Sequence, residues 1–496
     1  MNQDLIYGND KTERVVSIEP RGNLLTLFIQ DQTGTIRTEE REHFGWALAP
    51  SQLSSQWEEL KGDNHFKWRR KYSSHQRMKM DMSDDKWCAW DFKEAALIAH
   101  GITHFKGLKL EDVSVLSFDI EATTLERGPD AKVLLISNTY RRGPFVERKL
   151  FAYNDFEDPA DFFNAWCSWV RERDPSILTG FHVLGYDIPY LDYCARMAGT
   201  QLLLGRDGSP LFISDYESKF RRDGSQFYGY NNALCYGREI VDTFFLSFKY
   251  DVGRKYTSNG LKNIIKQEGL EKPGRQHYDA SKISANYLIP AEWEKIRAYA
   301  ADDSDDALTL FDLFVPAFFY LAQSVPKTLQ QIVNGATGSQ INALLVRGYL
   351  QAGHSIPKAS EPEEYEGAIS IGNPGVYRNL WKFDAASLYP SIILAHHIED
   401  RGKDPLGYFQ IMMRHFTEQR LAHKKLGKSD RYFKDLSEAE KIVINSGYGF
   451  LGAPGLNFNS GKNAAEVTRL GREVLQTAIV WATGSRYEVG NLSHTK

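Results

Sequence analysis

Cysteines are few in this sequence, and long apolar runs are absent. The four cysteines, Cys88, Cys167, Cys194 and Cys235, lie far apart with no C-x-x-C pair. This spacing argues against zinc ligands and disulfides and predicts buried thiols in a reducing compartment. No run of about 18 apolar residues is present, so no membrane span is expected. The N-terminus lacks a basic segment followed by an apolar core, so no signal peptide is expected either.

An excess of positive charge is also missing. Lys and Arg number 60 against 64 Asp and Glu, which gives a net charge of -4. Binding to nucleic acid would therefore depend on local basic surfaces rather than on global charge. The segment 65–72, with cations and aromatics interleaved, is one candidate surface. A solvated edge strand explains the same segment equally well.

Low-complexity segments and repeats are absent as well, and the 496 residues predict about three domains. Among the acidic residues, Asp119 and Glu121 end a β-branched, alternating segment, 113–120, that predicts a buried strand. Because side chains two apart lie on one face of a strand, these two carboxylates should lie together. Asp187 closes a second segment, 179–187, after a predicted strand at 176–178.

The third acidic segment, 297–303, begins a predicted helix and places Tyr299 four residues before Asp303. Asp303 joins Asp119, Glu121 and Asp187 in a set of four carboxylates that can bind two Mg²⁺ or Mn²⁺ ions. The hydroxyl of Tyr299 can orient a water. That combination is typical of two-metal phosphodiester hydrolysis. Each segment alone is weak, because the acidic run 302–306 is more often a solvated turn. Asp302 is a rival for the role of Asp303.

Another candidate metal ligand lies at Asp384. The segment 382–391 predicts an apolar strand that ends in Asp384, followed by a turn carrying Ser387, Tyr389 and Pro390. A carboxylate at a strand end can hold Mg²⁺, and the ring of Tyr389 can form the floor of a small pocket. Alone, such a segment is more often structural.

A helix is predicted to open after Ser437 and Glu440, which match a capping box. Lys441, Asn445 and Tyr448 would then share one helix face. A cation, an amide and an aromatic ring on one face suit a nucleoside triphosphate. An amphipathic core helix is the alternative.

The region before that helix is locally basic. A helix is predicted from Tyr408 to Leu426, with Arg420 and Lys424 on one face. Residues 401–441 hold ten Lys/Arg and six Asp/Glu. A solvated charged face is the usual explanation for such a run, and phosphate binding is the functional one.

Taken together, these segments resemble the motifs of one family. Asp384 to Ser391 resembles motif A of the family B DNA polymerases, D-x-x-S-L-Y-P-S, and Lys441 to Gly449 resembles their motif B, K-x-x-x-N-S-x-Y-G. The three acidic segments resemble, in order, the Exo I, Exo II and Exo III motifs of the DEDDy 3′→5′ exonucleases. The Y-x-x-x-D spacing of Exo III favours Asp303 over Asp302.

The resemblance implies a multidomain α/β fold. Its parts are a mixed α+β N-terminal domain, an RNase H-like 3′→5′ exonuclease domain and a partial polymerase palm with helical fingers. The implied boundaries are 1–105 with a return segment at 326–366 for the N-terminal domain, 106–325 for the exonuclease, 367–399 and 464–496 for the palm, and 400–463 for the fingers.

The resemblance also implies roles for individual residues, with Mg²⁺ or Mn²⁺ in two-metal sites. Two departures from the family pattern are His182, where Asn is usual, and Ala368, where Gly is usual. The implied residues are Asp119, Glu121, Asp187 and Asp303 as exonuclease metal ligands with Tyr299 as their catalytic partner, Asp384 as polymerase metal ligand, Tyr389, Arg420, Lys424, Lys441, Asn445 and Tyr448 for the nucleotide, and His182, Tyr365 and Gly367 for DNA.

One family motif is missing. Motif C, Y-G-D-T-D-S, would supply a second polymerase aspartate, but no Asp follows Asp435. The expected function is therefore the N-terminal large fragment of a DNA-directed DNA polymerase with a proofreading exonuclease. Its expected partners are primer-template DNA, dNTPs, a C-terminal fragment carrying motif C and the thumb, and a sliding clamp. The expected location is the cytoplasm, in association with the nucleoid, if the protein is prokaryotic or viral. The alternatives are a stand-alone 3′→5′ exonuclease and an inactive scaffold.

Overall fold

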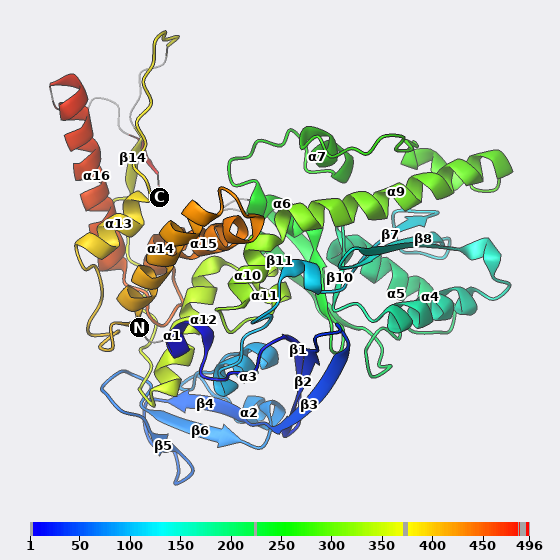
Figure 1. Ribbon diagram of the computed structural model, residues 1–496. Helices are drawn as coiled ribbons and strands as arrows, with labels where there is room; N and C mark the ends of the chain where they lie inside the picture. Colours follow the sequence, from blue (N-terminus) through cyan, green and yellow to red (C-terminus); the bar gives the residue numbers. More distant parts are fainter. Residues whose placement is uncertain (1–2, 223–225, 371–374, 485, 487–492, 496) are drawn as a thin grey trace.

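The computed structural model describes residues 3–222, 226–370, 375–484, 486 and 493–495 (Figure 1). Within these residues, three groups of elements follow one another along the chain. They are a strand-rich N-terminal part, a central part built on a five-stranded sheet, and a helical C-terminal part.

The N-terminal part holds two small antiparallel sheets. The first has the order β1-β2-β3, and the second has the order β4-β6-β5. Leu25, Leu27 and Ile29 alternate along β2 and are buried against helix α3, as the period of a half-buried strand requires. The bounds are α1 (Gln3–Tyr7), β1 (Val15–Arg21), β2 (Leu24–Gln30), β3 (Ile36–Glu42), β4 (Gly45–Ala49), β5 (Glu58–Glu59), β6 (Trp68–Tyr72), α2 (His75–Met80) and α3 (Phe92–His100).

Residues 68–72 of the basic-aromatic segment form β6, which is the middle strand of its sheet. The reading of this segment as an edge strand is therefore wrong, because β4 and β5 pair with it on both sides.

The central sheet has the strand order β13-β10-β7-β8-β9. Strands β13, β10 and β7 run parallel to one another. Strand β8 is antiparallel to β7, and β9 is antiparallel to β8. The bounds are β7 (Val115–Ala122), β8 (Val133–Arg142), β9 (Phe145–Ala152), β10 (Ile177–Gly180) and β13 (Glu239–Asp242). The predicted strands at 113–120 and 176–178 are thus confirmed, each displaced by about two residues.

Helices cover both faces of this sheet (Figure 1). One face packs on α4, where Phe118 contacts Trp166 with ring centroids 5.6 Å apart. The other face packs on the long helix α9, where Leu135 meets Ile296. Asp119 and Glu121 alternate with Phe118 and therefore point toward α9. The bounds are α4 (Pro159–Arg173), α5 (Ile188–Met197) and α9 (Pro290–Phe314).

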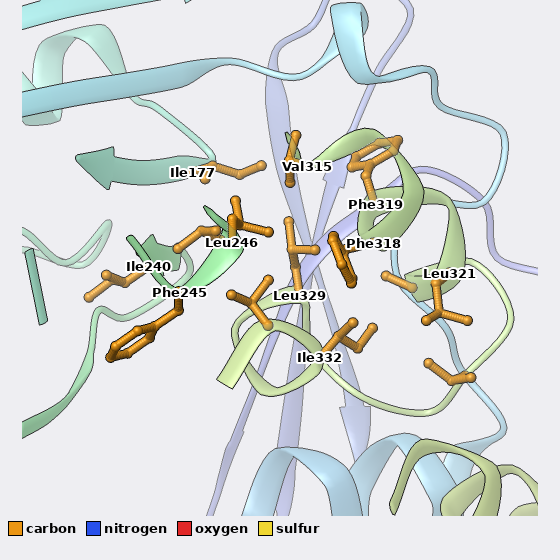
Figure 2. Close-up of a cluster of buried hydrophobic side chains, with 14 of the residues drawn as sticks. Ile177, Ile240, Phe245, Leu246, Val315, Phe318, Phe319, Leu321, Leu329 and Ile332 are labelled. Atoms are coloured by element: carbon orange, nitrogen blue, oxygen red, sulfur yellow. The ribbon is translucent and has the colours of Figure 1, made fainter. Parts of the chain in front are cut away.

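Beyond the sheet, a hairpin and several helices complete the central part. Figure 2 shows the apolar cluster in which α6, α10 and α11 meet the sheet, with Phe318 and Leu329 at its centre. The bounds are β11 (Phe212–Arg221), β12 (Phe227–Leu234), α6 (Thr243–Tyr250), α7 (Leu261–Gln267), α8 (Ile283–Asn286), α10 (Pro316–Ala322), α11 (Leu329–Asn334) and α12 (Thr337–Gln351). Short 3₁₀ turns are η1 (Leu110–Asp112), η2 (Tyr153–Asp155) and η4 (Ala280–Lys282).

The predicted helix at 297–303 is part of α9, which starts earlier, at Pro290, and is followed directly by α10. Pro316 separates them, because proline lacks the N–H group that a continuous helix needs.

The C-terminal part is an antiparallel helix pair with a third long helix beside it (Figure 1). Its bounds are β14 (Ala368–Ser370), α13 (Leu388–Ala395), α14 (Tyr408–Leu426), α15 (Arg431–Gly452), α16 (Gly461–Thr483) and β15 (Ser493–Thr495). Helix α14 has the predicted bounds. The predicted helix start after Ser437 is wrong, because the side chain of Asp430 caps α15 by accepting from the N–H of Tyr432 at 2.9 Å.

The predicted strand at 382–384 is also wrong. This segment has no regular secondary structure and belongs to none of the described sheets, and a strand needs a neighbour to satisfy its backbone groups. All four cysteines are free and buried, as predicted. Among the described helices, none combines the length and the apolarity that a membrane crossing requires.

Candidate active sites

The first candidate site is a carboxylate cluster between β7 and α9. One carboxylate oxygen from each of Asp119, Glu121 and Asp303 lies within 4.8 Å of the others. The two-residue period of β7 places Asp119 and Glu121 on the face that α9 crosses. Within the described residues, this is the only group of three or more His, Cys, Asp or Glu side chains with such spacing.

Asp187 completes the acidic set from a third element. It ends the single π-helical turn η3 (Val183–Asp187), and its Oδ1 accepts from the N–H of Ile120, between the two β7 carboxylates, at 3.3 Å. The turn is fixed by Asp242, whose side chain accepts from the N–H groups of His182 and Leu184, each at 2.9 Å. The four predicted carboxylates therefore come together from three separate segments.

The cluster strongly disfavours its own ionisation. Burial raises the pKa of Glu121 to about 8, and the charge of Asp303 adds to this effect. Burial followed by the charge of Asp242 raises the pKa of Asp187 to about 8. The pKa of Asp119 is raised well above its usual value by burial and then by Asp187. Carboxylates held this close favour the binding of cations, because each negative charge disfavours the ionisation of its neighbours.

Cationic side chains already reach one member of the cluster. Lys262 on α7 lies 3.3 Å from Asp303 and also donates to the hydroxyl of Tyr299. Arg275 donates to Asp303 and, at 2.6 Å, to Asp306. The pKa of Asp303 is nevertheless raised, because burial outweighs these two cations. Sequence reasoning did not find Lys262, because it lies outside every motif and only the fold brings α7 to α9.

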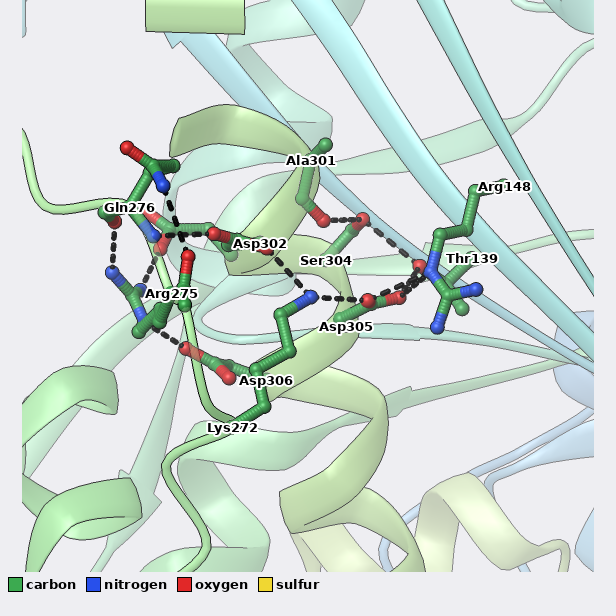
Figure 3. Close-up of polar contacts among 12 residues, drawn as sticks. Thr139, Arg148, Lys272, Arg275, Gln276, Ala301, Asp302, Ser304, Asp305 and Asp306 are labelled. Atoms are coloured by element: carbon green, nitrogen blue, oxygen red, sulfur yellow. Dashed lines mark hydrogen bonds and ion pairs between the residues drawn. The ribbon is translucent and has the colours of Figure 1, made fainter. Parts of the chain in front are cut away.

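The acidic run 302–306 is not a solvated turn. All four of its aspartates lie within α9 and are buried. Figure 3 shows Lys272 between Asp302 and Asp305, at 2.6 and 2.7 Å. Asp302 also accepts from the N–H of Gln276 at 2.7 Å and therefore points away from the carboxylate cluster. This geometry supports Asp303 over Asp302 as the cluster residue.

The second candidate site surrounds the start of α13. Arg420 donates to the hydroxyl of Ser387 at 2.7 Å. The rings of Tyr389 and Tyr448 lie 4.7 Å apart, and the hydroxyls of Tyr448 and Tyr365 lie 3.4 Å apart. Motif A, motif B and the segment around Tyr365 therefore meet here.

Helix α16 closes this second site. Its Gly471 allows close packing, because a Cβ there would lie 3.0 Å from the ring of Tyr389. On the same helix, Arg472 donates to the carbonyl oxygen of Gly367 at 2.6 Å. Asp384 is exposed and lies outside the carboxylate cluster found among the described residues.

The remaining predicted nucleotide-binding residues do not converge on Tyr389. Lys441 and Asn445 line a cleft whose lining does not include Tyr389 or Arg420. Lys441 is paired with Glu438 at 3.0 Å, and Lys424 is exposed on α14. Lys441, Asn445 and Tyr448 therefore do not share one site. Lys441 and Asn445 line the cleft, whereas Tyr448 lies beside Tyr389.

The chain has relatives among the archaeal DNA polymerases. It is 26% identical to DNA polymerase 2 of Aeropyrum pernix over 408 residues, which are 75% of this chain and 48% of that protein. It is 24% identical to a DNA polymerase of Pyrococcus glycovorans over 430 residues, covering 78% of this chain and 53% of the relative. The chain thus spans about half the length of the curated relatives it matches. No family model matches it.

The fold also has a known counterpart. The structure of the family B DNA polymerase from Pyrobaculum calidifontis superimposes with a TM-score of 0.74, covering 94% of this chain and 71% of that chain. At 18% identity this likeness concerns the fold alone. It places the central sheet, the helix pair and the N-terminal sheets within one known architecture.

Proposed function

Because this chain is a relative of archaeal DNA polymerases and has the fold of a family B DNA polymerase, we propose that it is the N-terminal large fragment of such an enzyme and carries its 3′→5′ proofreading exonuclease. The observation that carries the nuclease part is the enclosed carboxylate cluster on β7 and α9. The predicted domain boundaries fit this proposal.

The nuclease residues have distinct roles in this proposal. Asp119, Glu121, Asp187 and Asp303 would hold divalent cations, for which clustered carboxylates are suitable oxygen ligands. Bound Mg²⁺ or Mn²⁺ would supply positive charge at the phosphodiester and promote ionisation of a nearby water. Tyr299, whose hydroxyl is held by Lys262, would orient that water.

DNA contacts are proposed around both sites. His182 lies in the left-handed region, with φ 75°, beside Phe244 at a ring distance of 4.8 Å. In this proposal His182 would contact the strand that enters the nuclease site. Tyr365 and Gly367 would contact DNA between the two sites.

Substitution of Asp119 tests the nuclease proposal. The purified chain should shorten single-stranded or 3′-mismatched DNA from the 3′ end with Mg²⁺ or Mn²⁺. Asp119→Ala should reduce the rate by at least about 10³-fold, because it removes a metal ligand. Asp161→Ala, on the exposed surface of α4, is the matched control and should retain activity. Full activity of Asp119→Ala would refute the assignment.

For the polymerase site we propose roles that the chain fulfils only with a partner. Asp384 would hold metal, and Tyr389 would lie under the sugar and exclude a 2′-hydroxyl. The triphosphate and base would contact the cations and polar groups of α14 and α15, namely Arg420, Lys424, Lys441, Asn445 and Tyr448. No Asp follows Asp435 in this sequence, so the proposal assigns the second aspartate to a motif C outside it.

The exposed apolar segment beside Asp384 supports a C-terminal partner polypeptide that carries motif C and the thumb. Val376, Leu380, Trp381 and Phe383 are 98%, 77%, 86% and 68% exposed. Contiguous apolar exposure of this kind is typical of surfaces that another polypeptide covers. A sliding clamp, and a cytoplasmic location at the nucleoid, are further parts of the proposal.

A stand-alone 3′→5′ exonuclease is the second candidate function. The difference between the two sites favours it, because the nuclease carboxylates are assembled whereas Asp384 is exposed and alone. Complementation separates the two candidates. Addition of a polypeptide with a motif C hairpin and a thumb should restore DNA synthesis if the chain is a polymerase fragment, and should leave only degradation if it is not.

A further inference from the structure

The helix pair encloses a polar cluster next to the proposed nucleotide site. The cluster consists of Arg420 and His423 on α14, Glu440 on α15 and Tyr7 on α1. Glu440 is 7% exposed, so its carboxyl group lies in the interior of the protein. None of these four residues belongs to the nuclease carboxylate cluster or lines the cleft that holds Lys441. The cluster is therefore a separate group of buried polar side chains.

The two oxygens of Glu440 have different surroundings. Its Oε1 lies 2.6 Å from Nδ1 of His423. Its Oε2 is buried and has no hydrogen-bond partner among the described residues. A buried oxygen without a partner is unfavourable, and more so when it carries a charge. This arrangement therefore favours the protonated carboxyl group, with the proton shared between Glu440 and His423.

Arg420 is also only partly engaged. Its Nη1 donates to the hydroxyl of Ser387 at 2.7 Å. Its Nε is buried and makes no hydrogen bond within the part of the chain that the structure describes. The charge of Arg420 acts on Glu440, where it opposes the effect of burial on the pKa of the carboxyl group. Arg420 thus has two candidate partners, Ser387 and the open Oε2 of Glu440, and the structure shows it with Ser387.

The protonation state of Glu440 decides how strongly it attracts Arg420. Burial raises the pKa of Glu440 to about 8, although the charge of Arg420 lowers it. Burial lowers the pKa of His423, so its ring is neutral near pH 7 and can accept a proton from Glu440. Burial, followed by the charge of Glu440, raises the pKa of Tyr7, which stays a neutral hydroxyl. Ionised Glu440 would attract the guanidinium strongly, because hydrogen bonds between two charged groups are stronger than those to a neutral acid.

From this geometry we propose that the Glu440–His423 pair regulates the binding of a nucleoside triphosphate by Arg420. While the pair holds a proton, Arg420 faces Ser387 and contacts the triphosphate. When the pair loses that proton, Glu440 draws the guanidinium away, since a guanidinium uses the same N–H groups for phosphate and for carboxylate. The inference rests on the proposed role of Arg420 in nucleotide binding. It adds Glu440, which lies outside motifs A and B, as a positioning residue.

Binding of dATP in EDTA tests this regulation without metal or catalysis. Isothermal titration calorimetry at pH 7, 8 and 9 measures the affinity of each chain relative to Arg420→Ala at the same pH, so that titration of the triphosphate itself cancels. The advantage of the wild-type chain over Arg420→Ala should be about tenfold at pH 7 and fall to about twofold at pH 9. Glu440→Gln does not titrate and should keep its advantage at pH 9. Glu418→Gln, exposed on α14, is the matched control and should follow the wild-type chain.

The wild-type profile tests the proposal by itself, even if Glu440→Gln does not fold. A wild-type advantage that is equal at pH 7 and pH 9 would overturn the proposal. A folded Glu440→Gln chain whose advantage falls as in the wild type would overturn it as well. If Arg420→Ala binds dATP as tightly as the wild-type chain at pH 7, the proposed nucleotide role of Arg420 is refuted and the inference with it. That outcome is distinct from the first two, in which Arg420 still contributes to binding.

Discussion

At the scale of single residues, the carboxylate cluster between β7 and α9 favours the protonated form of its members. The pKa values of Glu121 and Asp187 are each raised to about 8, mainly by burial. In the folded state they are therefore protonated across neutral pH, whereas in the unfolded state they ionise near pH 4. Metal binding must displace these protons, so metal affinity should rise with pH.

This shift makes a prediction for stability. Between about pH 4 and pH 8 the folded, metal-free protein binds more protons than the unfolded protein, so its free energy of unfolding should fall as pH rises. The glutamine of Glu121→Gln does not titrate. The free energy of unfolding of this variant should therefore depend on pH less steeply, by roughly one proton. Urea denaturation in EDTA at pH 5, 6, 7 and 8 measures the two slopes. Identical slopes would contradict the raised pKa of Glu121.

A second prediction concerns Lys262, which contacts both Tyr299 and Asp303. Lys262→Met should lower kcat for exonucleolytic cleavage by about 10²-fold, because Tyr299 loses the group that positions it. KM for single-stranded DNA should change little. Lys266→Met, on the exposed surface of the same helix, serves as the control. A change in KM alone would indicate a DNA contact instead of a positioning role.

Much of this site could be predicted from residues alone. A strand period places Asp119 beside Glu121, and the resemblance to the Exo III motif, Y-x-x-x-D, favours Asp303 over Asp302. The contribution of Lys262 could not be predicted, because it depends on how α7 docks against α9. Nor could the acidic run 302–306 be recognised as buried, since its partners Lys272 and Arg275 are remote in sequence.

At the scale of elements, local signals succeeded where the element is self-contained. Helix α14 has the predicted bounds, because its periodicity and its terminal Gly427 are local. The prediction of a strand at 382–384 is wrong because a strand depends on neighbours, and none of the described strands pairs with this segment. The predicted start of α15 is wrong because two N-cap signals compete, and Asp430 caps the helix before Ser437 is reached.

The competing caps of α15 can be compared directly. Asp430→Ala should lower the free energy of unfolding by about 1 kcal/mol, because the N–H of Tyr432 loses its acceptor. Ser437→Ala should change it by less than about 0.5 kcal/mol, because alanine is favourable within a helix. Urea denaturation monitored by circular dichroism measures both variants. A larger loss for Ser437→Ala would indicate that the helix starts there.

At the scale of the whole molecule, the two candidate sites differ in completeness. The nuclease carboxylates come from three segments of this chain and lie together. The polymerase motifs also meet, through Tyr389, Tyr448 and Arg420, but they bring only one aspartate, Asp384. The chain spans about half the length of the relatives it matches, which is compatible with the proposed fragment.

The most direct test is one primer-template assay with a 5′-labelled, 3′-mismatched primer, dNTPs and Mg²⁺. The chain alone should shorten the primer and never extend it, because a single carboxylate cannot form a two-metal site. Asp119→Ala should leave the primer unchanged in length. Robust extension by Asp119→Ala that disappears in the Asp119→Ala, Asp384→Ala double variant would contradict the proposal, since this chain would then contain a complete polymerase site.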